Sequence, residues 1–344
     1  MTGRATVVLD ELSITVVVDN ETDTLSSVDP GVPQLPEAAG LLGRPDLACH
    51  RAGHDGTEVF GQLCVACHGF SALLTARAGD DTATVLFDVG PYGDVWLANA
   101  ERLGIDLADI EVMFLSHWHF DHSGGFPAVV EAVSAARSAA GRSAPLVDLH
   151  PDRPDQRGTQ LPDGRLVLLP DEPTFAAIEA AGGRIVTNAE AHAVAGGLLY
   201  GSGAIERVTG YETGLPGHVT FHGDELTPDP LIMDERFLAA DVRGRGITVL
   251  SACSHAGVVN ACLAAKDAFP DTPVDLVLGG YHLAGAAVQD RIDATVRDLD
   301  ERVRARVVAP GHCTGWRAKA ALADRFAGGR YGPSVVGTRY VLSG

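Results

Sequence analysis

Strand and helix patterns alternate three times between residues 246 and 326. Short runs of β-branched and apolar residues predict three strands, at 247–250, 274–278 and 306–309. Longer stretches of helix-forming composition follow these runs, at 257–268, 287–305 and 318–326. This alternation is typical of helices packed on a parallel sheet, so it predicts an α/β layered fold.

A histidine follows each of these three predicted strands: His255, His282 and His312. Parallel strands end at the same edge of a sheet, which is where ligand sites form. For any one of these histidines a place in the core is the simpler interpretation. Three of them at equivalent positions favour a functional site.

The densest chemical signal follows another apolar run, residues 110–115. In the sequence SHWHFDHSGG that comes next, His117, His119, Asp121 and His122 stand close together. Imidazole and carboxylate groups are ligands of Zn, Mn and Fe. His117 and His119 can point the same way from the strand end, while Asp121 and His122 can serve a second ion across the turn. The segment therefore predicts a site for two divalent metal ions, with Zn favoured and Mn or Fe as alternatives.

Composition excludes several classes of function. The formal net charge of −19 would repel phosphate backbones, so we expect no nucleic-acid partner. A small substrate, anionic or neutral, is still allowed because bound cations reverse the charge locally. The mean hydropathy is +0.10, but no apolar run is long enough to span a membrane. Residues 1–4 lead into no apolar targeting segment, so we expect a cytoplasmic protein with reduced cysteines. An oligomer is compatible with these features.

The remaining chain is predicted to complete one domain over residues 1–344. Strands are predicted at 14–19 and, as a hairpin, at 70–77 and 83–89. Residues 22–60 are rich in proline, glycine and acidic residues and predict a long surface excursion or lid. Residues 151–245 read as an insertion, with a short helix at 174–181, short strands at 165–169 and 184–187, and a glycine-rich hairpin around 198–208.

Taken together, these motifs resemble the metallo-β-lactamase superfamily. HWHFDH is similar to its HxHxDH signature, and PGH at Pro310–His312 is similar to its last ligand motif. The branch that includes dihydropterin-ribofuranosyl-aminobenzene-phosphate synthase and generic metal-dependent hydrolases is a closer match. Its hallmarks occur in order along most of the chain, as HGFS (68–71), LFDVG (86–90), LANAERLGIDL, SHWHFDHSGG, LHPD (149–152), DERFL (234–238), CSHAGVVN (253–260), GGYHL and HCTG (312–315).

This resemblance implies a four-layer αββα sandwich and a hydrolase that uses a metal-activated water on a small ester, lactone or phosphoester. The implied metal ligands are His117, His119, Asp121, His122, His255 and His312. Asp121 would also orient the water, and His282 would act as a proton donor, a hydrogen-bond donor or a ligand. Asp88 would support the metal-binding histidines. His68 and Arg207 are implied substrate contacts, and no organic cofactor is expected.

The chain departs from the family pattern at several positions. Trp118 replaces the usual glycine before the second histidine, so we expect it to reshape the pocket and contact the substrate. Cys67 stands where the family usually has glutamate. The aspartate that usually bridges both metals is replaced by Cys253 or His255, of which we favour His255. His218 and His192 are candidates for a further upstream ligand.

Other interpretations compete with a hydrolase. A non-hydrolytic pterin-linked synthase could use the same fold, and so could a degenerate metal-binding protein, which the complete ligand cluster disfavours. A di-iron protein that handles oxygen would carry a carboxylate in place of one of the first histidines, which HWHFDH lacks. Residues 64–68 fit the C-x-x-C-H pattern of haem attachment or a C-x-x-C zinc or redox pair, but haem attachment normally requires export.

Overall fold

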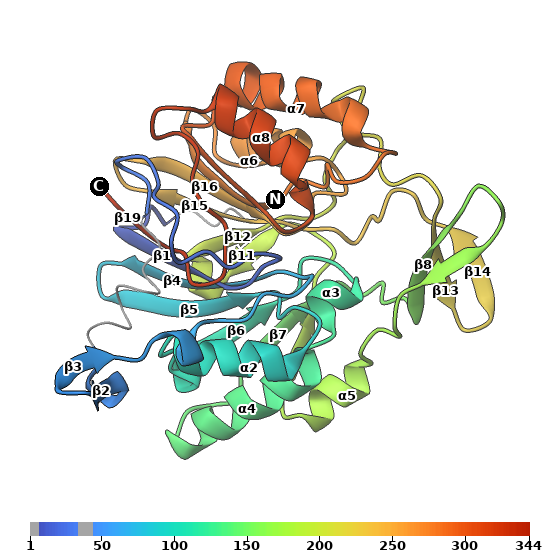
Figure 1. Ribbon diagram of the computed structural model, residues 1–344. Coiled ribbons are helices and arrows are strands. Elements are labelled where there is room, and N and C mark those ends of the chain that lie inside the picture. The colour runs from blue at the N-terminus through green and yellow to red at the C-terminus, as the bar shows by residue number, and fades with distance from the viewer. Residues whose placement is uncertain (1–6, 34–43) are drawn as a thin grey trace.

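A computed structural model describes residues 7–33 and 44–344 and contains two mixed β-sheets packed face to face (Figure 1). The first sheet has seven strands, in the order β10 (Arg184–Thr187), β7 (Leu146–Leu149), β6 (Ile110–Phe114), β5 (Asp81–Phe87), β4 (Ser71–Ala78), β1 (Glu11–Val18) and β19 (Arg339–Ser343). The second has six, in the order β11 (His192–Val194), β12 (Leu199–Gly201), β15 (Leu238–Val242), β16 (Gly246–Ser251), β17 (Val274–Gly280) and β18 (Val307–Gly311).

Helices cover the outer face of each sheet, as Figure 1 shows. The first sheet carries α2 (Gly93–Arg102), α4 (Phe126–Ala139) and α5 (Phe175–Ala180). The second carries α6 (Val258–Ala268), α7 (Ile292–Asp298) and α8 (Trp316–Arg325). One apolar core lies between the sheets, and a further core lies under each helical layer. The predicted four-layer αββα sandwich is therefore confirmed.

The central parallel strands β6, β16, β17 and β18 are almost fully buried, because layers cover both faces of each sheet. Every residue of β17 is buried, and β16, β17 and β18 run parallel to one another. In the first sheet β5, β6, β7 and β10 are also parallel, while β4 and β5 form the predicted antiparallel hairpin. The carboxyl ends of these parallel strands carry the segments with the predicted ligands.

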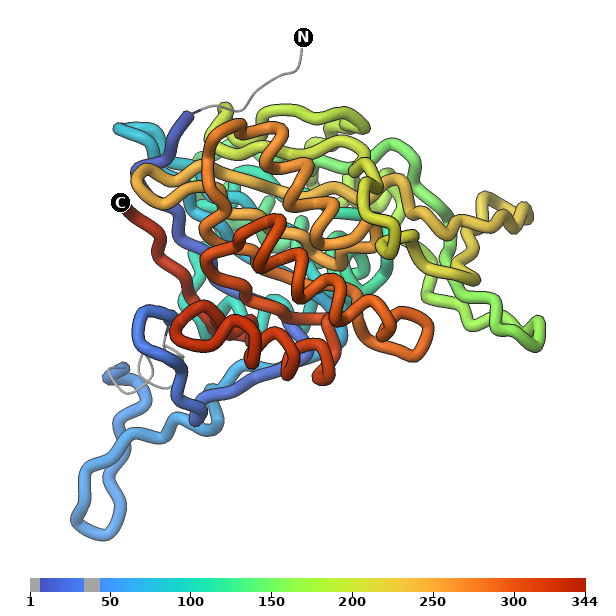
Figure 2. The backbone as a smooth tube through the Cα atoms, turned by 90° about the horizontal axis from the view of Figure 1, so that it is seen from above, coloured from blue at the N-terminus to red at the C-terminus, as the bar shows by residue number. Residues whose placement is uncertain are grey.

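Residues 151–245 contribute to several layers. They add α5 and β10 beside the first sheet and β11, β12 and β15 to the second. They also form a separate antiparallel sheet, which projects beyond the sandwich in Figures 1 and 2: β14 (Glu225–Pro228), β13 (His218–His222), β8 (Gln156–Gln160) and β9 (Leu166–Leu168). The hairpin predicted around 198–208 is wrong, because β12 pairs with β11 and β15 and residues 202–217 form neither helix nor strand.

The described part of the predicted excursion forms an exposed hairpin of β2 (Ala48–Arg51) and β3 (His54–Thr57). Figures 1 and 2 place this hairpin on the opposite side of the sandwich from the projecting sheet. Residues 34–43 of the excursion, like residues 1–4, lie outside the described residues. Among those described, no helix is long and apolar enough to cross a membrane.

A buried ion pair joins the two sheets. Asp148 on β7 accepts a hydrogen bond from Arg236, which lies just before β15, at 2.8 Å, and another from His192 on β11 at 2.7 Å. The Arg236 side chain is fully buried, and its guanidinium carbon lies 4.1 Å from the centre of the Phe114 ring. Because Arg236 also donates to the carbonyl of Leu115 at 2.6 Å, the pair fixes the end of β6 that leads into the histidine cluster.

Candidate metal centre

Three imidazole nitrogens converge at the edge where the parallel strands end. His117 Nε2 lies 3.0 Å from His119 Nδ1, and His255 Nε2 lies 3.2 Å and 3.1 Å from these two atoms. We call these residues the three-histidine group. His117 and His119 follow β6 and His255 follows β16, so one ligand segment comes from each sheet.

Burial favours the neutral form of the three-histidine group. Burial lowers the pKa of each of these imidazoles well below the usual value, and the neighbouring imidazoles lower it further. A neutral imidazole is the form that binds a metal. Three nitrogens at such short distances cannot all be satisfied by hydrogen bonds to one another, because each bond needs one donor and one acceptor. The group therefore fits a cation held at its centre.

Partners on the far side of each ring fix which nitrogen faces the centre. His117 Nδ1 contacts Ser116 Oγ at 2.8 Å. His119 Nε2 lies 2.9 Å from Nε2 of His218, whose Nδ1 donates to the carbonyl of Asp229 at 2.7 Å. His218 Nε2 is then left as an acceptor, so His119 donates from Nε2 and keeps Nδ1 free for a ligand role. His218 thus lies behind His119.

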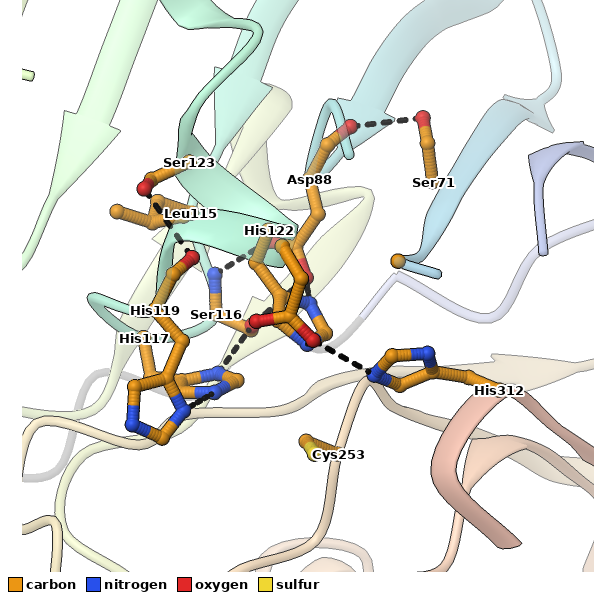
Figure 3. A network of polar contacts seen from close by, with 12 residues as sticks. Ser71, Asp88, Leu115, Ser116, His117, His119, His122, Ser123, Cys253 and His312 are labelled. Carbon is orange, nitrogen blue, oxygen red and sulfur yellow. Dashed lines mark hydrogen bonds and ion pairs between the residues drawn. The ribbon is translucent and has the colours of Figure 1, made fainter. Parts of the chain in front are cut away.

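A second group contains Asp121, His122 and His312, and we call it the Asp121 group. Figure 3 shows His122 and His312 of this group beside His117 and His119. Asp121 Oδ2 is 3.3 Å from His312 Nε2 and 3.7 Å from His122 Nε2. His122 Nδ1 donates to Asp88 at 2.8 Å, and His312 Nδ1 is 3.0 Å from the side-chain oxygen of Asn20. Both histidines therefore turn Nε2 toward Asp121.

The Asp121 group combines a carboxylate with two imidazoles, and these groups change one another's ionisation. Burial opposes ionisation of Asp121, but His122 and His312 lower its pKa well below the usual value. Burial also opposes a charge on His122, yet Asp121 and Asp88 raise its pKa to about 9. Among the described residues, His122 Nε2 is buried without a hydrogen-bond partner. A metal ion bound at this nitrogen would replace the proton and supply the missing partner.

Cys253 lies between the two groups, in the loop that follows β16. Its Sγ and the ligand nitrogens of His117 and His122 all lie within 4.8 Å of one another. His255, which we favoured as the replacement for the bridging aspartate, instead belongs to the three-histidine group. The intermediate position is therefore occupied by a thiol, which as thiolate is a competent zinc ligand.

His282 lies next to Cys253, and both residues line the pocket into which the two groups open. Its Nδ1 is 3.4 Å from Cys253 Sγ, and its ring centre is 4.4 Å from that of His255. The backbone of His282 has φ of 46° and that of His312 has φ of 42°. Non-glycine residues rarely adopt this left-handed conformation, and such strain is concentrated at functional sites.

Three consecutive charged residues, Asp234–Arg236, hold the ligand segments in place. Asp234 accepts a hydrogen bond from the backbone N–H of Trp118 at 2.7 Å, and Glu235 accepts one from that of His255 at 2.7 Å. The backbone N–H of Arg236 donates to the carbonyl of Ser116 at 2.8 Å. From the sequence, DERFL is recognisable only as a family motif, which predicts no role for its three charged residues. The signal for its role was a run of charges directly before a strand whose residues are mostly buried.

The two groups open into a pocket with a volume of about 760 Å³. His68 lies at its wall, with Nε2 3.4 Å from Asp121 Oδ2. Lys319 also lines the pocket and pairs with Glu21 at 3.0 Å. Much of the remaining wall is apolar or aromatic and includes Tyr92, Phe120, Val167, Leu169, Leu215 and Trp316. The described part of the 22–60 excursion contributes no residue to this wall, whereas the projecting sheet does.

Two predicted substrate contacts do not fit the structure. The Trp118 side chain is fully buried, donates to the carbonyl of His150 at 3.0 Å and packs on Phe175, so it faces away from the pocket. The alternating direction of side chains along this segment sends Trp118 to the opposite side from His117 and His119. Arg207 donates to the carbonyl of Leu231 and does not line the pocket.

His192, a candidate for a further ligand, pairs instead with Asp148 in the ion pair between the sheets. His218 reaches the three-histidine group only through His119. Neither residue belongs to the clusters of potential ligands found among the described residues.

Comparisons with known proteins agree with the fold described above. The model of the metallo-beta-lactamase superfamily matches residues 66–280. The 7,8-dihydropterin-6-methyl-4-(beta-D-ribofuranosyl)-aminobenzene-5'-phosphate synthase of Methanocaldococcus jannaschii is 26% identical over 262 residues, 75% of this chain and 85% of the relative. Tm1679, a metal-dependent hydrolase of the beta-lactamase superfamily, superposes with a TM-score of 0.65 at 22% identity, over 97% of this chain and all of that one. YhfI of Bacillus subtilis, a metallo-beta-lactamase fold protein, superposes with a TM-score of 0.51 at 11% identity, over 97% and 100% of the two chains.

Proposed function

The chain belongs to the metallo-beta-lactamase superfamily, and we propose that it is a metal-dependent hydrolase of a small ester, lactone or phosphoester. The observation that carries the proposal is the convergence of three neutral imidazole nitrogens beside the Asp121 group, with a thiol between them. A site of this composition is suited to two divalent cations, because it offers neutral and anionic ligands in two adjacent sets.

In this proposal the three-histidine group holds one cation and the Asp121 group holds the other, with Cys253 between them. Imidazole and thiolate ligands favour Zn, and the carboxylate is compatible with Mn or Fe. The cations would supply Lewis acidity and lower the pKa of a water molecule toward neutrality.

The side chains of the pocket have separate tasks in the proposed reaction. Asp121 turns one carboxylate oxygen toward His68 and the pocket, where it can accept a proton from a water molecule and orient it. His282 stands on the wall beside Cys253, where its imidazole can donate a proton to the leaving group. His68 is exposed and can donate a hydrogen bond to a substrate oxygen.

The pocket favours a substrate with an apolar or flat part and an anionic part. Tyr92, Phe120 and Trp316 provide aromatic surface at its wall, and Lys319 provides a cation. A volume of about 760 Å³ suits a small molecule.

A pterin-linked synthase is the second candidate function. It is favoured by the similarity to the archaeal synthase, which extends over 75% of the chain. A synthase of this kind would leave generic phosphodiesters and lactones unchanged while binding metal in the same ligands.

The decisive experiment combines metal analysis with a hydrolysis assay. Protein purified without chelator is expected to hold more than one metal ion per chain and to hydrolyse generic phosphodiester or lactone substrates. His119→Ala is expected to lose both properties, whereas His54→Ala, on the exposed β2–β3 hairpin, is expected to retain them. Less than one metal ion per chain, unaffected by His119→Ala, would refute the proposal. Metal binding without turnover of these substrates would favour the synthase.

A further inference from the structure

Cys313 brings a second thiol into contact with Cys253. The two Sγ atoms are 3.1 Å apart, and both residues line the pocket although each is largely buried. Cys313 follows His312 in the HCTG segment. The metal centre described above uses Cys253 and leaves Cys313 without a task.

The contact depends on how three neighbouring strands end. Cys253 follows β16 and Cys313 follows β18, and β17 lies between these strands. β17 ends in Gly280, which has no side chain to displace the sulfur of Cys313. A Cβ atom on Gly280 would come within 2.7 Å of Cys313 Sγ and 2.5 Å of the carbonyl oxygen of Ala252. Any larger residue would push against the cysteine or the backbone.

We propose that Cys253 and Cys313 form a reversible disulfide at the floor of the pocket, and that this disulfide displaces the cation of the Asp121 group. A disulfide bond is about 2.0 Å long, so the two sulfurs need to approach by about 1 Å, which small side-chain rotations can provide. The pocket gives a small oxidant from solvent access to both sulfurs.

A peroxide is the class of oxidant that balances the reaction. It oxidises one thiol to a sulfenic acid as its O–O bond breaks and one water forms. The second thiol then attacks this sulfur, the S–S bond forms, and the sulfenic oxygen leaves as a second water. Two thiols and one hydrogen peroxide thus give one disulfide and two water molecules, and a thiol reductant reverses the change.

The effect on the metal follows from the position of Cys253, and this step rests on the proposed function. Thiolate, and not disulfide, is the metal-binding form of cysteine. Oxidation would therefore remove the ligand that lies near both His117 and His122. The three-histidine group contains no sulfur and would keep its cation.

The test uses the full chain, purified with its metal and treated with a small excess of hydrogen peroxide. Excess peroxide is destroyed with catalase, free thiols are alkylated, and the protein is digested without reductant for mass spectrometry. We expect a cross-linked peptide that contains Cys253 and Cys313, release of about half of the bound metal to a chromogenic chelator, and reversal by dithiothreitol.

Two variants sharpen the test. Cys313→Ser is expected to form no cross-link and to keep its metal under peroxide. Cys49→Ser, on the exposed β2–β3 hairpin, is expected to behave as the unmodified protein. Absence of the cross-linked peptide would overturn the proposal. Equal metal loss from Cys313→Ser under peroxide would also overturn it, and so would a Cys313→Ser protein that lacks metal before oxidation, because Cys313 would then be a ligand.

The peptide analysis needs no variant, so the proposal is tested even if Cys313→Ser fails to fold. If the protein as purified binds no metal, the proposed function fails, while the cross-linked peptide still decides whether the disulfide forms. Repeating the oxidation on chelator-treated protein separates the two outcomes.

Discussion

Replacing Asp148 by asparagine removes the charge from the ion pair that joins the two sheets while keeping the size of the side chain. The partner, Arg236, would stay buried, because its guanidinium is enclosed by β7, the end of β6 and the Phe114 ring. In the substituted protein Arg236 would keep backbone carbonyl acceptors, at Leu115, Asp148 and Asn188, but would lose its hydrogen-bonded carboxylate.

The expected loss of stability follows from the burial of the Asp148–Arg236 ion pair. Side chains of Asp148 and Arg236 are only 6% and 0% exposed. Removing one partner of a buried ion pair typically lowers the free energy of unfolding by about 3–5 kcal/mol. Because Arg236 keeps its carbonyl acceptors, we expect Asp148→Asn to lower it by about 3 kcal/mol. Asp163→Asn is the matched control, because Asp163 pairs with Arg165 at 2.7 Å but both side chains are more than half exposed. Solvent screens that pair, so the control should leave stability almost unchanged.

Urea unfolding followed by fluorescence and circular dichroism measures the difference between the two variants. The pH dependence gives a second readout. Burial raises the pKa of Asp148, but hydrogen bonds from His192 and Arg236 outweigh this effect and bring the pKa below its usual value of 3.8. A lowered carboxyl pKa contributes stability above pH 3.8, and this contribution is lost as the pH falls through the folded-state pKa.

Asp148→Asn should therefore lose stability at neutral pH and show a flatter decline in acid than the unmodified protein. The reasoning is refuted if Asp148→Asn and Asp163→Asn lower the unfolding midpoint equally. It is also refuted if Asp148→Asn is as stable as the unmodified protein at pH 7.

Three further substitutions test how the metal ligands are positioned. His218→Ala should weaken metal binding by about 10- to 100-fold, because it removes the partner behind His119; competition with a chelating dye measures this, and unchanged affinity would contradict the role. Glu235→Gln, which weakens the hold on the backbone of His255, should also lower metal affinity, by a smaller factor, and an increase would contradict the argument. Trp118→Phe should lower the free energy of unfolding by about 1–2 kcal/mol through loss of a buried hydrogen bond and should leave KM unchanged. A large rise in KM would show that Trp118 contacts the substrate after all.

The positions of the candidate ligands that adjoin regular strands could be predicted from the sequence. The apolar runs before His117, His255, His282 and His312 set the strand ends, and parallel pairing aligns these ends within each sheet. The face-to-face packing of the two sheets then brings His117 next to the histidines of the second sheet. Short-range periodicity was enough for this part of the fold.

Contacts between segments that are distant in the sequence could not be predicted. His218, the first residue of β13, reaches His119 because the projecting sheet borders the pocket, and no local pattern encodes that approach. The intermediate position of Cys253 depends on the loop after β16, in which Ser254 has φ of 60°. His255 was favoured because a buried cysteine is more often an apolar core residue than a metal ligand.

The pairing of β1 with β19 has a consequence for synthesis of the protein. These strands are adjacent and antiparallel, with Glu11 opposite Ser343, although more than 300 residues of chain separate them. The first sheet lacks this neighbour until residues 339–343 have been made. During translation β1 therefore keeps one unpaired edge until the residues of β19 have been made. Contacts between such distant residues slow folding, and an unpaired edge can join a strand from another chain. Chaperone demand during translation should consequently be higher than for a sandwich whose strands pair in the order of synthesis.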